Sequence, residues 1–549
     1  MTRLGLTILA AVALATAAGS KPAGPGLGAD ITYVNTSGLE YVPTDSRVYD
    51  DFDLLRTTGV FRSMPSTSKP WTRGECVRLL IEAHDADWDA LGPAQRAALK
   101  RLEFEFGAEL QDVPARRPSF RIAVPDLGDA EARCNLFSRA TANRARQTAS
   151  LGAIIDNRPD DNFVFYERFE ITAYHPGILE ESIPRDSSGR HVPGMRSLVW
   201  RNLATLETDP AYVAFRLPMA VRLELGRDRF VWGPGFTGST MLDDTAPGLD
   251  HIQLSASYRN FKLLSFTSYL SRWNTRPRFL SAQRLEVSLF NRVTLGGAMM
   301  SVASWDELQP TQLGGLINPL IPIYLTVSND GHDENLLVGW DAVVYLPQTK
   351  VYGQLFMDNY EFNELLIAPN AVGIQGGAYW VPNLPVEARL EYTRVTAFTY
   401  YHRKHSLIYE NFLTTMGHPL GPDADQLFAT VNVTPNGWFR VNVGVDYTRR
   451  GYHNRGDYLR KSYKEPQDTV YLRHHDEFPT RGWDTIPDPD TLIEEVDKTL
   501  RFNPGLEVRA LRDLFISFSV GLWHSQNYQG TIGLNKNGVD LILKVEYRY

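Results

Sequence analysis

The sequence predicts an all-β transmembrane barrel of about 18 antiparallel strands, with a small N-terminal α-helical domain that serves as a plug or periplasmic domain. Three observations support this fold class. Many segments alternate apolar and polar residues, the period-two pattern of strands with two different faces. Several of them reach the roughly 9 to 11 residues that a tilted strand needs to cross a bilayer. After residue 20, no apolar run approaches the ~18 residues of a spanning helix.

The composition fits this class and excludes others. Of 549 residues, 43% are hydrophobic, and a mean hydropathy of -0.27 excludes a membrane protein built from many helices. Aromatic residues make up 11% of the chain, which suits a barrel with aromatic girdles at both membrane interfaces. The net charge of -8 argues against a nucleic-acid partner, because such proteins normally show a basic surface.

The chain begins with a predicted secretory signal peptide over residues 1–20. A basic start is followed by the short apolar run LGLTILAAVALATAA, which contains small residues near its end. Export would place Cys76 and Cys134 in an oxidising periplasm, where they could form a disulfide. Two buried thiols on separate helices are an equally open alternative, because the sequence does not give the distance between them.

Residues 21–150 are predicted to form a spacer followed by the helical domain. Apolar residues at near-helical spacing mark a first helix in VYDDFDLLRTTGVF, which Gly59 can end. Thr72 and Glu75 form the capping-box pattern at the start of a second helix, CVRLLIEAHD. A third helix is predicted within residues 93–110.

Residues 151–549 are predicted to form the barrel. The central stretch YVAFRLPMAVRLEL is predicted to be one long strand over residues 212–225, and its charged neighbours are expected to face the lumen or lie in a loop. Glycines and Pro234 then let the backbone turn. Similar alternation recurs in segments that begin at Phe163, Ile252, Val386, Val441, Leu514 and Val539. At about 10 residues per strand plus turns, this region fits 16 to 20 strands, and 18 is the predicted number.

The C-terminus carries a further signal. The chain finishes on Tyr549 within the alternating strand VDLILKVEYRY. This ending resembles the C-terminal signal of bacterial outer-membrane barrels, which their assembly machinery reads. The sequence therefore predicts a protein of the bacterial outer membrane that contacts the barrel assembly machinery, outer-membrane lipids and lipopolysaccharide, and that is a monomer.

The densest polar cluster beside the central strand has two possible roles. It consists of Arg227, Asp228, Arg229 and Trp232. Arginines can hold carboxylates or phosphates and tryptophan can stack on sugar rings, so the cluster is a candidate polysaccharide-binding site. The alternative is a lumenal ion-pair network that holds strands and plug together. Further candidate sugar platforms are the loop aromatics Trp305, Tyr400, Tyr401, Tyr458, Tyr463 and Trp483.

Metal binding and catalysis have little support. His474, His475, Asp476 and Glu477 are consecutive, and consecutive side chains rarely converge on one ion. The acid pairs Asp243–Asp244 and Asp423–Asp425 have no recognisable nucleophile or base beside them, and no hydrolase or phosphate-loop motif is present. The prediction is therefore a protein without a metal or other cofactor and without enzymatic activity.

Three blocks carry a resemblance to a known family. They are VPTDSRVYDDFDLLRTTGVF with KPWTRGECVRLL, GRDRFVWGPGFTGSTMLDDTAPGLDHIQL, and TMGHPLGPDADQLFATVNV. The first also resembles an S-layer-homology module. Together they resemble the Wzi family of capsule-assembly outer-membrane proteins. That resemblance implies an eighteen-stranded barrel with a periplasmic-side helical bundle, acting as a lectin that holds capsular or extracellular polysaccharide at the cell surface. The alternative function is a porin or oligosaccharide channel.

Overall fold

The computed structural model describes residues 38–548 apart from a set of internal gaps. These gaps are 85, 87, 108, 111–121, 124–130, 143–146, 161, 176–197, 201–203, 219–220, 259, 274–275, 305–333, 359–370, 383, 397–398, 403–404, 413, 437, 452–495, 510–513 and 529–532. The predicted signal peptide lies outside the described residues.

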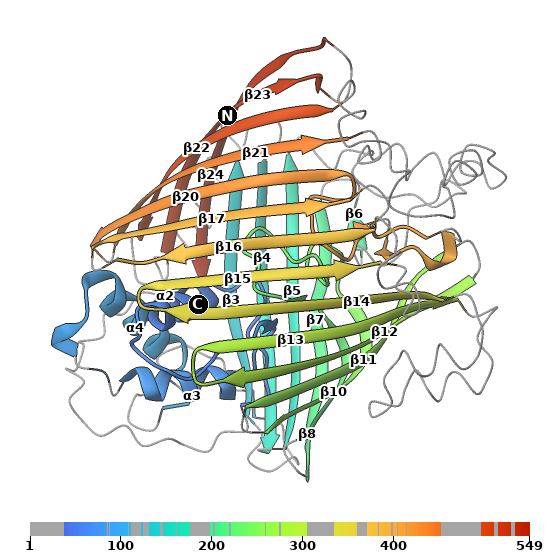
Figure 1. Cartoon of the computed structure of the whole chain (residues 1–549). Helices are drawn as coiled ribbons and strands as arrows, with labels where there is room; N and C mark the ends of the chain where they lie inside the picture. The colour runs from blue at the N-terminus through green and yellow to red at the C-terminus, as the bar shows by residue number, and fades with distance from the viewer. Residues whose placement is uncertain are drawn as a thin grey trace.

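A closed antiparallel barrel forms most of the molecule (Figure 1). Within the described residues, eighteen long strands make its wall: β3 (Glu131–Ala142), β4 (Gln147–Asp160), β5 (Phe163–His175), β7 (Ala204–Leu217), β8 (Val221–Asp228), β10 (Leu249–Tyr258), β11 (Phe261–Trp273), β12 (Arg276–Leu289), β13 (Val293–Ser304), β14 (Asn335–Leu346), β15 (Thr349–Met357), β16 (Val372–Trp380), β17 (Val386–Val395), β20 (Ala424–Asn436), β21 (Phe439–Arg450), β22 (Asp497–Arg509), β23 (Leu514–Gln526) and β24 (Lys536–Arg548). The last strand, β24, pairs with β3 and closes the wall. Two short strands, β2 (Ile122–Ala123) and β6 (Leu198–Trp200), pair with β3 and β7. The predicted fold class and strand number are confirmed.

Two boundaries differ from the sequence prediction. The stretch 212–225 is not one strand, because β7 ends at Leu217 and β8 begins at Val221, and the two pair as a hairpin. The connection has three residues, so the alternation continues in phase across the turn and hides it. The barrel also begins at β3, before the predicted boundary at residue 151. The charges in EARCNLFSRATA obscure that strand in the sequence.

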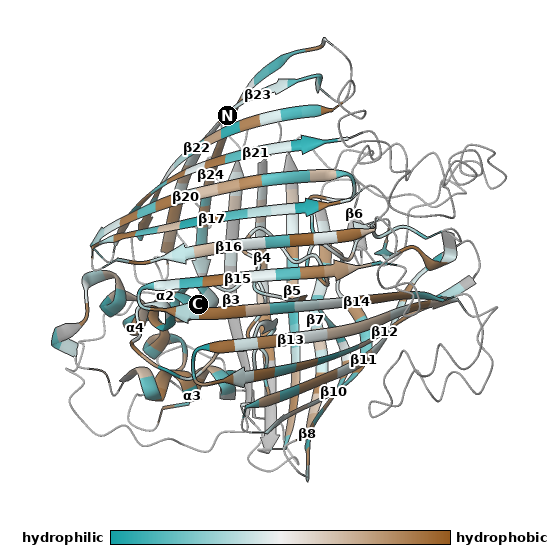
Figure 2. Cartoon of the chain, viewed as in Figure 1, coloured by the Kyte–Doolittle hydropathy of each residue, from teal (hydrophilic) through white to brown (hydrophobic). Residues whose placement is uncertain are grey.

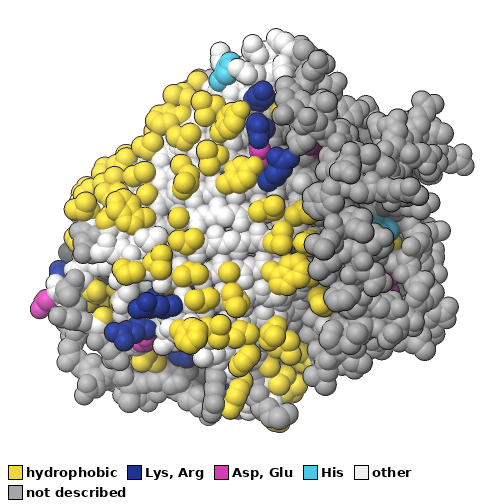
Figure 3. Space-filling model, viewed as in Figure 1, with side chains coloured by type: hydrophobic (Ala, Val, Ile, Leu, Met, Phe, Trp, Pro, Cys, Tyr) yellow, Lys and Arg dark blue, Asp and Glu magenta, His cyan; other side chains and the backbone are white. Residues whose placement is uncertain are grey.

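The two faces of the wall carry opposite chemistry. On β8, Arg222 and Glu224 are buried and point into the barrel, whereas Leu225 is exposed on the outside. Brown and teal residues alternate along the strands in Figure 2. Figure 3 shows hydrophobic side chains spread over the outer wall, with basic side chains near its edges. This arrangement lays apolar side chains against lipid and keeps charges away from it, as a barrel in the outer membrane requires.

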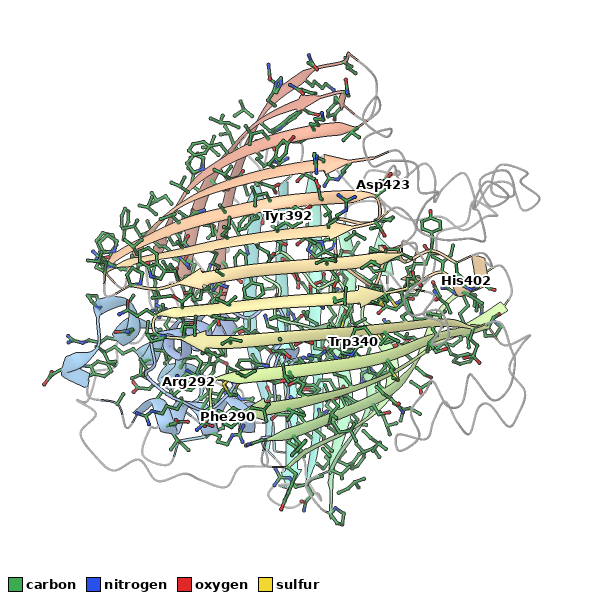
Figure 4. All side chains as sticks on the ribbon, viewed as in Figure 1. Phe290, Arg292, Trp340, Tyr392, His402 and Asp423 are labelled. Carbon is green, nitrogen blue, oxygen red and sulfur yellow. The ribbon has the colours of Figure 1, made fainter. Side chains whose placement is uncertain are left out.

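The two ends of the barrel differ in their connections. Strands β12 and β13 are joined at the helical end by a short turn that carries Phe290 and Arg292, and β14 and β15 are joined there by Pro347 and Gln348 (Figure 4). His402 and Asp423 lie at the opposite end, where the connections are longer. Short turns are typical of the periplasmic end of outer-membrane barrels. We therefore call the helical end periplasmic and the other end outer.

Three α-helices stand at the periplasmic end (Figure 1). They are α2 (Val48–Thr57), α3 (Arg73–His84) and α4 (Pro93–Glu105), with the short helix η1 (Trp88–Ala90) between the last two. The predicted capping box is confirmed, since Thr72 N donates to Glu75 Oε2 (2.8 Å) and Glu75 N donates to Thr72 Oγ1 (3.1 Å). The helices share an apolar core that also contacts the wall through β16. Among the described helices, none has the length and apolar character for a membrane span.

The two cysteines lie in different kinds of element. Cys76 is a buried free thiol in α3, whereas Cys134 is on strand β3. The alternative of two thiols on separate helices is therefore wrong. Burial raises the pKa of the Cys76 thiol, which keeps it protonated and unreactive.

Ion pairs join the helices to the inner face of the wall. Asp53 of α2 accepts a hydrogen bond from Lys350 Nζ (2.9 Å) and lies 3.2 Å from Arg389 Nη1. Glu75 of α3 accepts from Lys262 Nζ (2.7 Å). Burial alone would raise both pKa values, but these cations hold the pKa of each carboxyl below its usual range. The helical domain is thus attached through carboxylates that stay ionised.

Candidate functional site: the barrel lumen and its outer end

A segment between two wall strands folds into the lumen. We call residues 229–248, which connect β8 to β10, the lumenal segment. Its strand β9 (Val231–Trp232) pairs with β1 (Ser68–Lys69) of the N-terminal region, and Gly233 N donates to Thr67 O (3.0 Å). Gly233 has φ +128°, and a Cβ there would overlap the side chain of Gln354. The lumenal segment therefore reaches from the outer end of β8 to the helical domain and lies tightly against the wall.

A buried charged network fixes β1 to the wall. Arg284 is fully buried, and its Nη2 lies 2.7 Å from Asp341 Oδ2 while its Nε lies 3.1 Å from Glu286 Oε1. The same guanidinium donates to Thr67 Oγ1 and Ser68 Oγ, both at 2.7 Å. Two carboxylates, one guanidinium and two hydroxyls satisfy one another here, which is the condition under which charges can be buried.

A second stretch between β17 and β20 holds the lumenal segment from the outer side. It contains η5 (His405–Leu407), β18 (Glu410–Asn411) and β19 (Thr414–Thr415). Tyr400 Oη donates to Thr240 O (2.8 Å), and Tyr409 Oη donates to Met241 O (2.9 Å). The rings of both tyrosines also contact Phe356 of the wall. This packing closes the β10–β17 half of the lumen with apolar and hydrogen-bonded contacts.

Two titratable groups in these lumenal stretches are shifted by burial. Burial and the neighbouring Asp244 raise the pKa of Asp243 to about 6, although Thr245 and Ser239 donate hydrogen bonds to its carboxyl. Burial lowers the pKa of His418 to about 3, so this imidazole is neutral at physiological pH. His418 therefore contributes hydrogen bonds rather than charge, including one from Leu420 N to its Nδ1 (3.1 Å).

The four residues of the predicted cluster do not converge on one site. Arg227 lies on the outer face of β8, near the outer end, where its Nε is 2.7 Å from Asp250 Oδ1. The expectation that every charge beside the central strand faces the lumen or a loop is wrong for Arg227. Asp228 is buried on the inner face, and Arg229 Nε is 2.8 Å from Asp209 Oδ2. The Arg229–Asp209 ion pair fits the predicted lumenal network. The four side chains do not form a shared ligand site.

Some of the predicted aromatic platforms are buried, and the others lie outside the described residues. Trp232 is 1% exposed and packs edge-on against Phe266, so its ring offers no face to a sugar. Tyr400 and Tyr401 are buried as well. The remaining candidates, Trp305, Tyr458, Tyr463 and Trp483, lie outside the described residues, as does the run His474, His475, Asp476 and Glu477.

The described acid pairs hold the local structure through hydrogen bonds and ion pairs. Asp243 caps the turn at Ser239 and Thr245, and Asp425 forms an ion pair with Arg449. Within the described part of the chain, no three His, Cys, Asp or Glu side chains are grouped as metal ligands.

The other half of the lumen exposes a polar wall that the sequence analysis missed. On β22, Leu500 and Phe502 face outward, so Arg501 and Asn503 face inward. Arg501 lies 3.6 Å from Asp540 of β24, and the two side chains are 42% and 43% exposed. Trp523 of β23 is opposite Arg501 in the ladder. The alternation in LFISFSVGLWHSQ was the available signal, because it places the tryptophan on the same face as the three serines.

A cavity lies at the periplasmic end of this wall. Its volume is about 370 Å³, and α2, α4 and strands β17 and β20 to β24 line it. Arg47 and Glu507 form an ion pair in its lining, with 2.6 Å between Nη1 and Oε1. Basic and acidic side chains are equally numerous around the cavity, so it carries no net preference for one sign of charge.

Comparisons with known proteins agree with this architecture. The family model of the capsule assembly protein Wzi matches residues 160–511. The chain is similar to a Wzi of Escherichia coli, an outer membrane protein involved in group 1 capsule assembly and described as a carbohydrate-binding β-barrel. The identity is 15% and the TM-score 0.59, over 93% of this chain and 99% of that one. OprD of Pseudomonas aeruginosa is similar at 8% identity and a TM-score of 0.42, over 79% and 99% of the two chains. OpdK of Pseudomonas aeruginosa, solved with vanillate, gives 10% and 0.42 over 77% and 98%. No curated protein sequence matches this chain.

Proposed function

This chain belongs to the capsule assembly protein Wzi family, and from that premise we propose that it binds capsular or extracellular polysaccharide at the cell surface. In this role it is a non-enzymatic, lectin-like outer-membrane protein that attaches the polymer during capsule assembly. The observation that supports binding rather than free passage is the packing of the lumen between β10 and β17. There the lumenal segment is held by Gln354, which donates to Trp232 O, by Arg284, which contacts Met241, and by the tyrosines of the following stretch.

Binding can be tested with the polymer of the producing organism. The purified protein in detergent should retain surface polysaccharide from that organism on a biosensor surface, and a deletion strain should release polymer into the medium. Complementation should restore attachment. A protein that shows no affinity for the polymer, together with unchanged attachment in the deletion strain, would refute the proposal.

A porin or oligosaccharide channel is the second candidate function. The half-exposed inner wall around Arg501 and Asp540 favours it, because a fully packed lumen would bury those side chains. Conductance in planar bilayers separates the two functions. A channel would pass ions steadily, whereas a polysaccharide-binding barrel with its helical domain attached should conduct little.

The remaining predicted partners are part of the same proposal. The apolar outer face would contact outer-membrane lipids and lipopolysaccharide, the C-terminal strand would contact the barrel assembly machinery during insertion, and the protein would act as a monomer. Arg229, with the undescribed loop aromatics, stays a candidate for contacts with polymer at the outer end. The resemblance of the helical domain to S-layer-homology modules also stays a prediction.

A further inference from the structure

The inner wall differs between the two halves of the barrel. Between β10 and β17, inward side chains such as Arg278, Arg284 and Gln354 are at most 3% exposed, because the lumenal stretches cover them. Between β21 and β24, inward side chains stay partly exposed, including Arg501 and Asp540. A polar surface of this extent within a barrel is available to a hydrophilic ligand.

Amide, hydroxyl and indole groups make up most of the exposed wall, with Arg501 toward its outer end and with Glu507 and Lys544 opposite Ser517 toward the other end. We call Asn442, Asn503, Ser517, Ser519, Arg501 and Trp523 the polar strip. Two of the wall positions beside them are glycines, Gly505 opposite Ser519 and Gly521 on the neighbouring strand. The side chains of Asn442 and Asn503 lie over these glycines, and the amide and hydroxyl groups of the strip can both donate and accept hydrogen bonds. This chemistry matches the hydroxyl groups of sugars.

An aromatic ring stands at the outer end of the strip. Trp523 lies against Gly538 of the neighbouring strand, where any Cβ would overlap the indole. Its ring is nearly parallel to that of Tyr528, at an angle of 16° and with 5.9 Å between centroids. Lys536 Nζ lies 4.2 Å from the Tyr528 ring centroid on the same edge of the barrel. Gly538 thus gives the indole room to pack against the wall beside Tyr528, which places a pair of aromatic rings at the outer end of the strip, the kind of surface on which a pyranose ring can stack.

The charges beside the strip do not favour an anionic ligand. Around Arg501, three carboxylates accompany two guanidiniums. Asp540 lies 3.6 Å from Arg501, Asp446 is opposite Arg501 in the ladder, and Asp497 is opposite Arg450, whose charge also acts on Asp446 and Arg501. Asp446 also accepts hydrogen bonds from Gln426 Nε2 (2.7 Å) and Thr448 Oγ1 (2.6 Å), which hold its carboxylate in place. A carboxylated or sulfated sugar would meet repulsion at this point.

From this wall we infer that the polar strip is a binding site for an extended, uncharged segment of polysaccharide that enters the lumen from the outer end. A sugar ring stacks on Trp523, and the following sugars lie along Asn503, Ser519 and Asn442 toward the cavity beneath. This inference rests on the proposed function, and it assigns the polymer a place inside the barrel in addition to the loops. The path of the polymer then ends at helices α2 and α4 and at the Arg47–Glu507 ion pair.

A bulky side chain in the middle of the strip tests the assignment. Ser519→Trp places an indole across the middle of the strip, beside Gly505 and the Asn442 amide that covers it, whereas Phe518→Trp on the same strand adds an indole on the lipid side and is the matched control. The probe is surface polysaccharide of the producing organism, with the full-length protein in detergent. We expect Ser519→Trp to weaken binding roughly tenfold or more and Phe518→Trp to bind like the wild type. Equal binding by Ser519→Trp and the wild type would overturn this inference but leave the proposed function standing. A wild type that fails to bind would overturn the proposed function itself.

Two further measurements complete the test. The first is informative even if Ser519→Trp does not fold, and the second tests the charge of the ligand. Ser519→Cys should react with a water-soluble thiol reagent, and bound polysaccharide should slow that reaction, while Ser268→Cys on the covered inner face of β11 should not react. A reaction rate at Ser519→Cys that is unchanged by polysaccharide refutes the assignment. Binding should change less than about twofold between 0.1 M and 1 M salt, because an uncharged segment is not screened. A steep loss of affinity at high salt would show that the strip holds an anionic segment instead.

Discussion

Residues of the same type have different roles here because the strand register decides which face they occupy. Arg222 and Arg227 are five positions apart on β8, yet Arg222 is buried beside Glu224 and Arg227 lies outside beside Asp250. Trp232 is buried as part of the lumenal segment, whereas Trp523 lies on a partly exposed wall. Sequence alternation assigns a face, so Arg222 could be placed correctly. It does not reveal what covers that face, so the sequence left open whether Trp232 lies in a binding site or in a lumenal network.

The buried Arg284 allows a prediction about the role of a single residue. Arg284→Ala leaves Glu286 and Asp341 without their guanidinium, and breaking such a buried network costs about 3 to 5 kcal/mol. We expect a clearly lower temperature for the heat-induced mobility change of the folded barrel on a gel. Leu285→Ala, on the lipid face of the same strand, is the control and should change this temperature little in detergent. Equal stability of the two variants would contradict the structural role of the network.

Individual elements were predictable where their pattern is local. The helices and the capping box at Thr72 follow from short-range periodicity, and the long strands follow from alternation. The hairpin between β7 and β8 was missed because an odd-numbered turn preserves the phase of the alternation. The path of residues 229–248 into the lumen could not be predicted, because it depends on pairing with Ser68, more than 160 positions earlier.

The lumenal segment gives a prediction about Gly233. Gly233→Ala forces a side chain into a left-handed backbone conformation and against Gln354, at a cost of order 1–3 kcal/mol. We expect the lumenal segment to loosen and trypsin to cleave after Arg229 more rapidly in the variant. Gly533→Ala also has positive φ but meets no neighbouring atom within 4 Å, so it should leave this cleavage unchanged. Unchanged cleavage in Gly233→Ala would mean that the segment is not held at this point.

Attachment of the helices should depend on pH. The folded pKa values of Asp53 and Glu75 are lowered by Lys350 and Lys262, so their contribution is fully present above the unfolded values. It is lost as the pH falls through the lowered values, below about pH 4. Spin labels at Arg78→Cys and Phe290→Cys should give one narrow distance distribution at pH 7 and a broad one at pH 3. Asp53→Asn with Glu75→Gln should broaden the distribution already at pH 7. A narrow distribution under all conditions would show that these carboxylates do not hold the domain.

At the scale of the whole molecule, barrel and helices act as one unit. Several ion pairs span their interface, among them Arg47–Glu507, Lys350–Asp53 and Lys262–Glu75. The overall class, with its N-terminal helices, was predictable because many weak alternating segments agree and the helical pattern precedes them. The ion pairs that attach the helices to the wall were not, because contacts between distant segments leave no pattern in a single sequence.

Reversing the charges on the helical side of this interface should open the barrel. Arg47→Glu, Asp53→Lys and Glu75→Lys together place like charges opposite one another, and repulsion should displace the helices. We expect ion conductance in planar bilayers to rise about tenfold or more over a nearly closed wild type. The control changes Arg62, Arg78 and Lys100 to Glu on the exposed side of the domain and should not conduct. High conductance of the wild type would instead support the channel function.

The pairing of Ser68 with Trp232 also constrains how the molecule is assembled. Ser68 precedes every wall strand in the chain, yet the closed barrel surrounds it. The strand pairing that closes the barrel joins the first long strand to the last. The surrounded stretch must therefore be in place before that pairing forms, or must be threaded afterwards through one of the two openings. The position of this N-terminal stretch inside the barrel therefore limits when the last strand can be added.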